Sequence, residues 1–257
     1  MRKWVLGASD PEMVQIEEVL EAGGEDYGYA AINGVRCHSG NVYRADAVAS
    51  ATHWVECWAA AGCTLIAVPI DHHRPGDYGY LRGPEHYLAA SSLGQVLEVL
   101  EVPAMAHHRL AAASDHCPAA AYRGLCPGIE PLALRAWRLQ GRAAFQGRSV
   151  EEVEADVTAA IARLDVADPL YLDIYDMRGP IIPELPEALL VAGVAAVAGL
   201  LTDRDGRRKY VLLGAGRGTS AGPEAVTWFL EEYCVYEGLV DTYGSPVRGY
   251  GGGYVRI

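Results

Sequence analysis

The chain has 257 residues, of which 51% are hydrophobic and 21% are charged. This is the composition of an ordinary globular protein, so it excludes global disorder, and the length suits one large domain or two small ones. The formal net charge of −12 argues against a long nucleic acid as the partner, because nucleic-acid-binding proteins usually carry a basic surface.

The longest apolar run, residues 188–201, is shorter than the ~20 residues that a membrane-spanning helix needs. Six cysteines occur without a CxxC pair, so we interpret them as reduced thiols. We therefore expect a cytoplasmic protein that does not associate with membranes. Whether it forms a homo-oligomer stays open at this point.

The first predicted elements, in chain order, are typical of an α/β domain. Residues 3–8 predict a short strand. Asp10 and Pro11 then predict the start of a helix, because Asp is a favoured N-cap and Pro is favoured at the first helical position. Residues 63–70 form a nearly continuous apolar run, typical of a strand buried on both faces of a parallel sheet. The other elements predicted before residue 165 are a strand at 27–32 and helices at 47–61, 84–101, 104–123, 131–145 and 149–164.

A change in composition near residue 165 predicts a domain boundary, which divides the chain into residues 1–165 and residues 166–257. The elements predicted after it are strands at 170–174 and 209–213 and helices at 187–201 and 223–236. The predicted fold class is α/β, with a parallel sheet flanked by helices in the first domain and a smaller α/β domain after it.

The sequence Asp71-His72-His73 ends the apolar run at 63–70. Open α/β sheets bind their ligands at the carboxyl ends of the strands, which is where these three side chains are expected. A carboxylate beside two imidazoles suits a divalent cation such as Mn²⁺ or Zn²⁺. The alternative interpretation is a polar turn with exposed histidines.

Three more acidic side chains are candidates for the same site. Asp10 and Glu12 follow the first predicted strand, and Asp115 lies in an Ala-rich helix, where a buried carboxylate needs a partner. The alternatives are that Asp10 acts only as an N-cap and that Asp115 forms an ion pair with Arg109 or Arg123.

The order of these motifs resembles that of the DHH phosphoesterase superfamily. This superfamily includes RecJ-type exonucleases, oligoribonucleotide and cyclic-dinucleotide phosphodiesterases, and manganese-dependent inorganic pyrophosphatases. The resemblance covers about residues 3–120. The matching residues are Asp10 and Glu12 in the first motif, Asp46 in the second, Asp71-His72-His73 in the signature and Asp115 in the fourth.

The resemblance implies a divalent-metal-dependent hydrolase of a phosphodiester or phosphoanhydride bond. Its cofactor would be one or two ions of Mn²⁺ or another divalent cation, and its substrate a small nucleotide-like molecule or a short oligonucleotide. His73 would donate to the substrate phosphate, and Asp71 would orient an imidazole or the metal. The implied metal ligands are Asp10, Glu12, Asp46, Asp71, His72 and Asp115.

The sequence departs from the family pattern at two positions. Leu6 stands where the family often has a His, and Glu12 replaces the commoner second Asp, so one ion instead of two is a possible occupancy. Leu6 also favours an alternative function, a non-catalytic protein of the same fold that binds or sequesters a nucleotide.

The second domain contains a glycine-rich turn at 214–222, between a predicted strand and a predicted helix. Backbone N–H groups in such a turn can hold a phosphate, and dinucleotide binding is a further alternative. Glycine allows a backbone to approach an anion closely, and arginine makes bidentate phosphate contacts. We therefore expect the substrate to lie in the cleft between the two domains. The predicted substrate-binding residues are Arg217, Arg248, Gly252 and Gly253.

Overall fold

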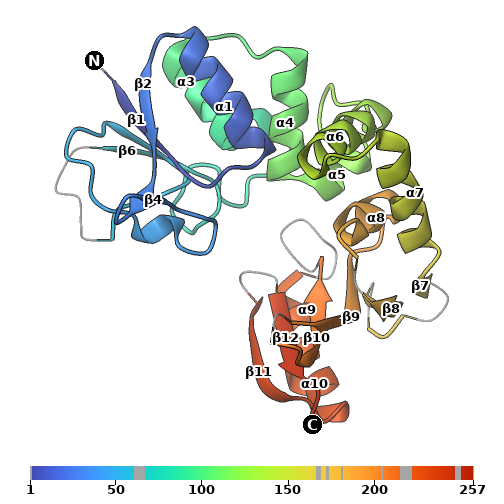
Figure 1. Cartoon of the computed structure of the whole chain (residues 1–257). Helices are drawn as coiled ribbons and strands as arrows, with labels where there is room; N and C mark the ends of the chain where they lie inside the picture. Colours follow the sequence, from blue (N-terminus) through green and yellow to red (C-terminus); the bar gives the residue numbers. More distant parts are fainter. Residues whose placement is uncertain are drawn as a thin grey trace. The chain divides into compact units, whose positions relative to one another are not determined.

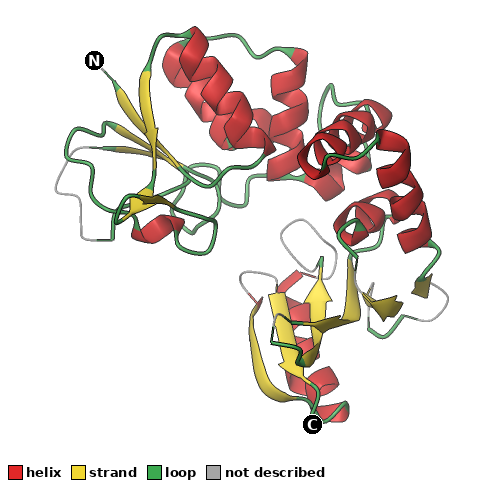
Figure 2. Ribbon diagram, viewed as in Figure 1, coloured by secondary structure: helices red, strands yellow, loops and turns green. Residues whose placement is uncertain are grey.

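The computed structural model describes residues 2–60, 67–165, 169–171, 174–180, 182–203, 205–214, 222–246 and 250–256. Contacts within the chain divide it into two compact units, Met1–Leu134 and Arg135–Ile257. The fold is α/β, with a parallel sheet flanked by helices in the first unit and a separate mixed sheet in the second (Figure 1, Figure 2). Among the described residues, no helix is long and apolar enough to cross a membrane.

The first unit is built on a four-stranded parallel sheet with the order β2-β1-β5-β6. Its strands are β1 (Lys3–Leu6), β2 (Asp26–Tyr29), β5 (His53–Val55) and β6 (Val68–Ile70). Strand β1 pairs with both β2 and β5, and its residues Trp4 and Leu6 are fully buried. Because all four strands run in the same direction, their carboxyl ends lie at one edge of the sheet.

Three helices of the first unit, α1 (Pro11–Ala22), α3 (Ser92–Leu100) and α4 (Ala106–His116), pack against one another beside this sheet (Figure 1). The predicted start of α1 is confirmed, because the Asp10 carboxylate accepts a hydrogen bond from the Met13 N–H at 2.7 Å. The shorter elements of this unit are β3 (Ala31–Ile32), β4 (Val35–Arg36), η1 (Val42–Arg44), η2 (Pro84–His86), α2 (Tyr87–Ala90) and α5 (Pro118–Tyr122).

The helix predicted over residues 47–61 is wrong, because strand β5 lies within it. His53, Trp54 and Val55 pair in parallel with both β1 and β6, and all three are buried. The segment is apolar without a clear period, so its sequence does not separate helix from strand, and the pairing partners decide. Glu56 directly follows this strand.

Two long predicted helices are each interrupted. Within 84–101, Ser91 adopts an extended conformation and caps α3, its hydroxyl accepting a hydrogen bond from the Gly94 N–H at 3.0 Å. Within 104–123, α4 ends before Cys117, and a proline then starts α5. Local capping chemistry accounts for both breaks.

Two thiols of the first unit lie against each other. The Sγ atoms of Cys117 and Cys126 are 3.1 Å apart, and both side chains are buried. Both cysteines are free, and Cys117 comes directly after the last residue of α4.

The second unit is built on a six-stranded sheet with the order β11-β12-β10-β9-β8-β7, in which only β8 and β9 pair in parallel. Its strands are β7 (Leu164–Asp165), β8 (Ile174–Pro180), β9 (Ala196–Thr202), β10 (Arg208–Leu213), β11 (Val240–Ser245) and β12 (Tyr250–Tyr254). Its helices are α6 (Pro131–Gln146), whose first four residues belong to the first unit, α7 (Val150–Ile161), α8 (Leu185–Ala192), α9 (Gly222–Trp228), the π-helical turn η3 (Phe229–Tyr233) and α10 (Cys234–Tyr236).

The two units meet at residues 134 and 135, whereas the sequence predicts a boundary near residue 165. The helices α6 and α7 account for the difference, since they share one apolar cluster with α8. An ion pair of 2.8 Å between Arg138 of α6 and the fully buried Glu187 of α8 adds to this packing.

The helix predicted over 187–201 is wrong in its second half. α8 ends at Ala192, and Gly193 adopts the left-handed conformation with φ of 69°. Residues 196–202 form β9, which is parallel to β8 and antiparallel to β10. A continuous apolar run does not distinguish a buried helix from a buried strand, so the sheet decides this segment as well.

The glycines near the end of the chain lie in strand β12 and are buried. A Cβ atom added at Gly252 would lie 2.5 Å from the ring of Tyr243, and one added at Gly253 would lie 2.9 Å from Leu239 Cβ. Close packing of these side chains on the strand therefore accounts for glycine at both positions.

Candidate metal site

The ends of β5 and β6 position the first part of the site. Val55 pairs with Ile70, so the residues that follow them, Glu56 and Asp71, leave the sheet at the same edge. The Glu56 N–H donates to the Ile70 carbonyl at 2.9 Å, and Glu56 has a positive φ of 51°. A Cβ at Gly7, the residue after β1, would lie 2.7 Å from the Glu56 carbonyl oxygen. Glycine at this position therefore allows the backbone after β1 to lie close to the backbone of Glu56.

Helices α1 and α4 contribute the next two carboxylates. Glu12 lies in the first turn of α1, where its Oε1 accepts a hydrogen bond from the Leu93 N–H at 3.1 Å. Its other oxygen, Oε2, is 4.0 Å from His72 Nε2. Asp115, near the end of α4, places Oδ2 2.9 Å from the same nitrogen. Side chains far apart in the sequence therefore converge on His72.

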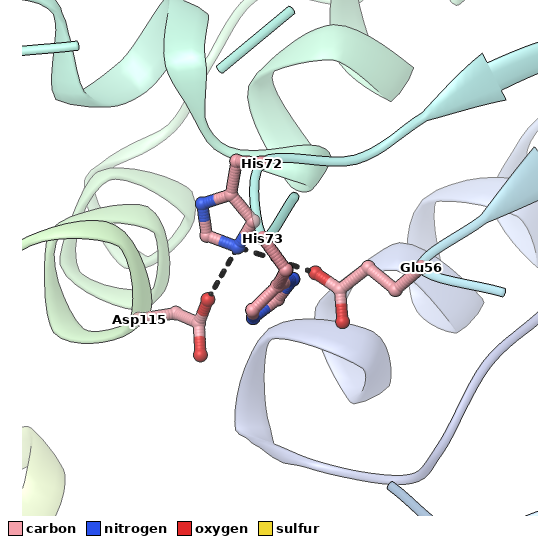
Figure 3. Close-up of side chains that lie close together, drawn as sticks. All are labelled: Glu56, His72, His73 and Asp115. Atoms are coloured by element: carbon pink, nitrogen blue, oxygen red, sulfur yellow. Dashed lines mark ion pairs between the residues drawn. The ribbon is translucent and has the colours of Figure 1, made fainter. Parts of the chain in front are cut away.

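The closest group of potential ligands consists of Glu56, His72, His73 and Asp115, which each offer one ligand atom within 4.8 Å of the others. Figure 3 shows the His72 imidazole between the carboxylates of Asp115 and Glu56, with His73 beside it. The distance from His72 Nε2 to Glu56 Oε1 is 3.5 Å. The cluster is buried apart from His73 and part of Asp115.

Apart from their contacts with His72 Nε2, three carboxylate oxygens have no hydrogen-bond partner in the described part of the chain. They are Oε2 of Glu12, Oε1 of Glu56 and Oδ2 of Asp115, and each is a buried atom. Burying carboxylate oxygens in this way is costly unless a cation compensates them. Carboxylate oxygens combined with imidazole nitrogens are donors that Mn²⁺ and Zn²⁺ accept, so the residues present fit a divalent cation.

The excess of acidic groups changes several pKa values. Burial, followed by repulsion from Asp115 and Glu56, raises the pKa of Glu12 well above its usual range. Burial and the same two carboxylates raise the pKa of Asp10 to about 7. Burial lowers the pKa of His72, but the neighbouring Asp115 and Glu56 outweigh this effect and raise it to about 11. In the metal-free protein, bound protons therefore compensate part of the negative charge.

Asp71 uses its oxygens within the protein. Its Oδ1 accepts hydrogen bonds from the N–H groups of His72 at 2.7 Å and His73 at 2.9 Å, and its Oδ2 accepts one from the Tyr43 hydroxyl at 2.8 Å. Burial opposes ionisation, but these bonds, foremost those from His73, lower the pKa of Asp71 to about 2. Asp71 therefore anchors the two histidines, and the structure does not place it among the converging ligand atoms.

His73 is the most accessible member of the cluster, with 47% of its side chain exposed. Its Nδ1 lies 3.0 Å from Asp71 Oδ1, so the ring offers Nε2 to the cluster. This placement suits either a metal ligand or a donor to a bound substrate.

The structure brings together three of the residues predicted as ligands, Glu12, His72 and Asp115. It places Asp46 elsewhere: this side chain is exposed, and its Oδ2 accepts a hydrogen bond of 2.6 Å from the Asn33 N–H, in the turn between β3 and β4. The turn interaction accounts for Asp46 without a metal.

Asp10 both caps α1 and lies close enough to Glu56 and Asp115 for their charges to raise its pKa. Glu56 is the site residue that the sequence analysis missed. Its position directly after a strand of the parallel sheet could have identified it, but the sequence predicted a helix over this strand. Arg217 and Arg248 lie outside the described residues.

Neither the family models nor the curated proteins include a match to this sequence. Among solved structures, the chain is similar to a pGpG-specific phosphodiesterase, PggH, from Vibrio cholerae. The TM-score is 0.43 and the sequence identity 11%, over 100% of this chain and 93% of that one.

Proposed function

We propose that the protein is a divalent-metal-dependent hydrolase of a phosphodiester or phosphoanhydride bond. The observation that supports this proposal is the convergence of Glu12, Glu56, His72 and Asp115, with three buried carboxylate oxygens that have no hydrogen-bond partner among the described residues other than His72. The proposed cofactor is Mn²⁺ or another divalent cation. The proposed substrate is a small nucleotide-like molecule or a short oligonucleotide, as the motif resemblance implies.

The four converging residues would hold the ion. A divalent cation held by these residues would supply a Lewis acid for a phosphoryl oxygen and would offset the negative charge that develops there. His73 is half exposed, and its Nδ1 donates to Asp71, so its Nε2 donates to the substrate phosphate when the ring is protonated. Burial lowers the pKa of His73, but the hydrogen bond with Asp71 outweighs this effect and raises it, which favours the protonated ring. Asp71 orients this imidazole through its Nδ1 and fixes which ring nitrogen faces the substrate.

A second candidate function is nucleotide binding without hydrolysis. The observation that favours it is Leu6, which is fully buried and offers no ligand atom at the end of β1. A site with fewer ligands holds a second ion less tightly, and an in-line displacement at phosphorus commonly uses two ions.

The two functions are separated by measuring metal content and hydrolysis on the same sample. Purified protein is loaded with Mn²⁺ and tested on pyrophosphate, mononucleotides, cyclic dinucleotides and short oligonucleotides, with a chelated sample as the control. We expect hydrolysis of at least one class, lost on chelation. Tight nucleotide binding without turnover would establish the binding protein instead, and a protein that retains no divalent ion would contradict the proposed metal site.

A further inference from the structure

His116, the last residue of α4, connects the metal cluster to the loop that follows β6. Its Nε2 lies 3.0 Å from the backbone carbonyl oxygen of Arg82, and its Nδ1 lies 2.8 Å from His72 Nδ1. A carbonyl oxygen only accepts hydrogen bonds, so Nε2 of His116 is the nitrogen that carries the hydrogen. In a neutral imidazole, the other nitrogen is then an acceptor.

The contact between the two histidines has the geometry of a hydrogen bond in the plane of the rings. The ring planes are 22° apart and the ring centroids are 5.1 Å apart. This centroid separation exceeds the 2.8 Å between the Nδ1 atoms by about the width of one ring, so the rings meet edge to edge. Since His116 Nδ1 accepts, His72 Nδ1 must donate.

We infer that His116 is a positioning residue, which holds a hydrogen on His72 Nδ1 and thereby reserves His72 Nε2 for a divalent cation. Nε2 is the nitrogen that faces Asp115 and Glu56. A histidine that binds a metal through one ring nitrogen commonly donates a hydrogen bond from the other, and the partner fixes the tautomer and the orientation of the ring. This inference rests on the proposed metal site.

The Arg82 carbonyl, which accepts the hydrogen bond from His116, is held in place by contacts within the loop. Leu81 adopts a positive φ of 57°, and the Arg82 side chain donates from Nε to the Tyr78 carbonyl at 2.8 Å. The Arg82 guanidinium also stacks on the Tyr78 ring at 3.9 Å from its centroid. The Arg82 carbonyl is therefore fixed by contacts that do not involve the metal cluster.

The test compares three variants of the full chain. His116→Leu removes the acceptor, whereas His116→Gln supplies an amide that can accept from His72 and donate to Arg82. His107→Ala is the control, because His107 is an exposed histidine of the same helix. Mn²⁺ affinity is measured by calorimetry, and the ring nitrogens of His72 and His116 are followed by ¹⁵N NMR in the metal-free and Zn²⁺-loaded protein.

We expect His116→Leu to weaken Mn²⁺ binding about 10–100-fold, the usual cost of losing such a partner, with His116→Gln restoring most of the affinity and His107→Ala unchanged. In the wild-type spectra, His116 should carry hydrogen on Nε2 alone, and His72 should keep the hydrogen on Nδ1 with and without Zn²⁺. A hydrogen on both nitrogens of His116, or equal Mn²⁺ affinity in the Leu variant, would overturn the inference. A wild-type protein that binds no metal would refute the proposed function, while the metal-free spectra would still decide the hydrogen-bond direction. If the Leu variant does not fold, the Gln variant and these spectra decide alone.

Discussion

Glu56 and Asp46 form a matched pair for testing the site at the level of single residues. Glu56 lies 3.5 Å from His72 Nε2, whereas Asp46, the residue that the motif resemblance implies, is engaged in an exposed turn. Loss of a residue that only supports a metal ligand commonly weakens metal binding by about 10–100-fold. Glu56 is a proposed direct ligand, so we expect Glu56→Gln to weaken Mn²⁺ binding by at least this factor. Asp46→Asn should leave it unchanged. Calorimetric titration of both variants checks this, and the opposite ranking would restore Asp46 as the ligand.

His73 is the residue for which binding and turnover should separate. Its half-exposed ring faces the cluster while Asp71 holds its Nδ1. We expect His73→Ala to retain Mn²⁺ and to lower kcat by about 10²–10⁴-fold, because a donor to the reacting phosphate acts mainly in the transition state. Metal analysis and steady-state kinetics on the same preparation measure both quantities. Loss of the metal in this variant would instead make His73 a ligand.

Metal binding should release protons. At neutral pH the metal-free protein keeps a proton on His72, whose pKa is about 11, and burial raises the pKa of Glu12 well above its usual range. A cation binds only the deprotonated groups, so Mn²⁺ affinity should rise with pH across the neutral range and fall as the solution is acidified. Calorimetry in two buffers of different ionisation enthalpy counts the protons released. The Glu12→Gln variant should release fewer, and a release independent of this residue would assign the protons elsewhere.

Gly79, in the loop after β6, packs where the structure leaves no room for a side chain. A Cβ at Gly79 would overlap the Ala90 carbonyl oxygen and lie 2.5 Å from His72 Cβ, and neither atom is the flexible end of a side chain. We expect Gly79→Ala to lower the free energy of unfolding by about 1–3 kcal/mol, the cost of overpacking, and to weaken Mn²⁺ binding by displacing His72. Gly28→Ala, in edge strand β2 with no atom within 4 Å of the added Cβ, is the control. Urea unfolding of both variants gives the comparison, and equal stabilities would show that the loop adjusts.

The elements that the sequence predicted well are those with local signals. Asp10 with the following proline marks the start of α1, and Ser149 with Glu152 forms the capping box that starts α7. Segments 47–61 and 187–201 have apolar runs without such signals, and pairing with distant strands decides their conformation. The same reason applies to the site: Asp71, His72 and His73 form a recognisable sequence motif, whereas Glu56 depends on strand β5, whose pairing no local pattern shows.

At the scale of the whole molecule, a metal should stabilise one unit selectively. The converging ligands belong to Met1–Leu134, and the part of Arg135–Ile257 that the structure describes contains no comparable group. A ligand at 100 times its Kd stabilises the state that binds it by about 2.7 kcal/mol. We expect Mn²⁺ to slow hydrogen exchange in peptides of the first unit and to leave those of the second unchanged, measured by mass spectrometry on the full chain. Chelation should abolish the protection and Glu56→Gln should reduce it, and equal protection of both units would refute this assignment.

The thiols of Cys117 and Cys126 lie beside the end of α4, the helix that carries Asp115. Their sulfur atoms are 3.1 Å apart, so loss of one hydrogen from each to a mild oxidant such as a diazenecarboxamide requires only a small movement to close a disulfide. We expect the oxidised protein to yield one cross-linked peptide, lighter by two hydrogen atoms, that Cys126→Ser cannot form. The cross-link would begin one residue after His116 and two after Asp115. Oxidation of these thiols would therefore add a covalent bond directly after α4, and metal affinities measured on oxidised and reduced samples should be compared separately.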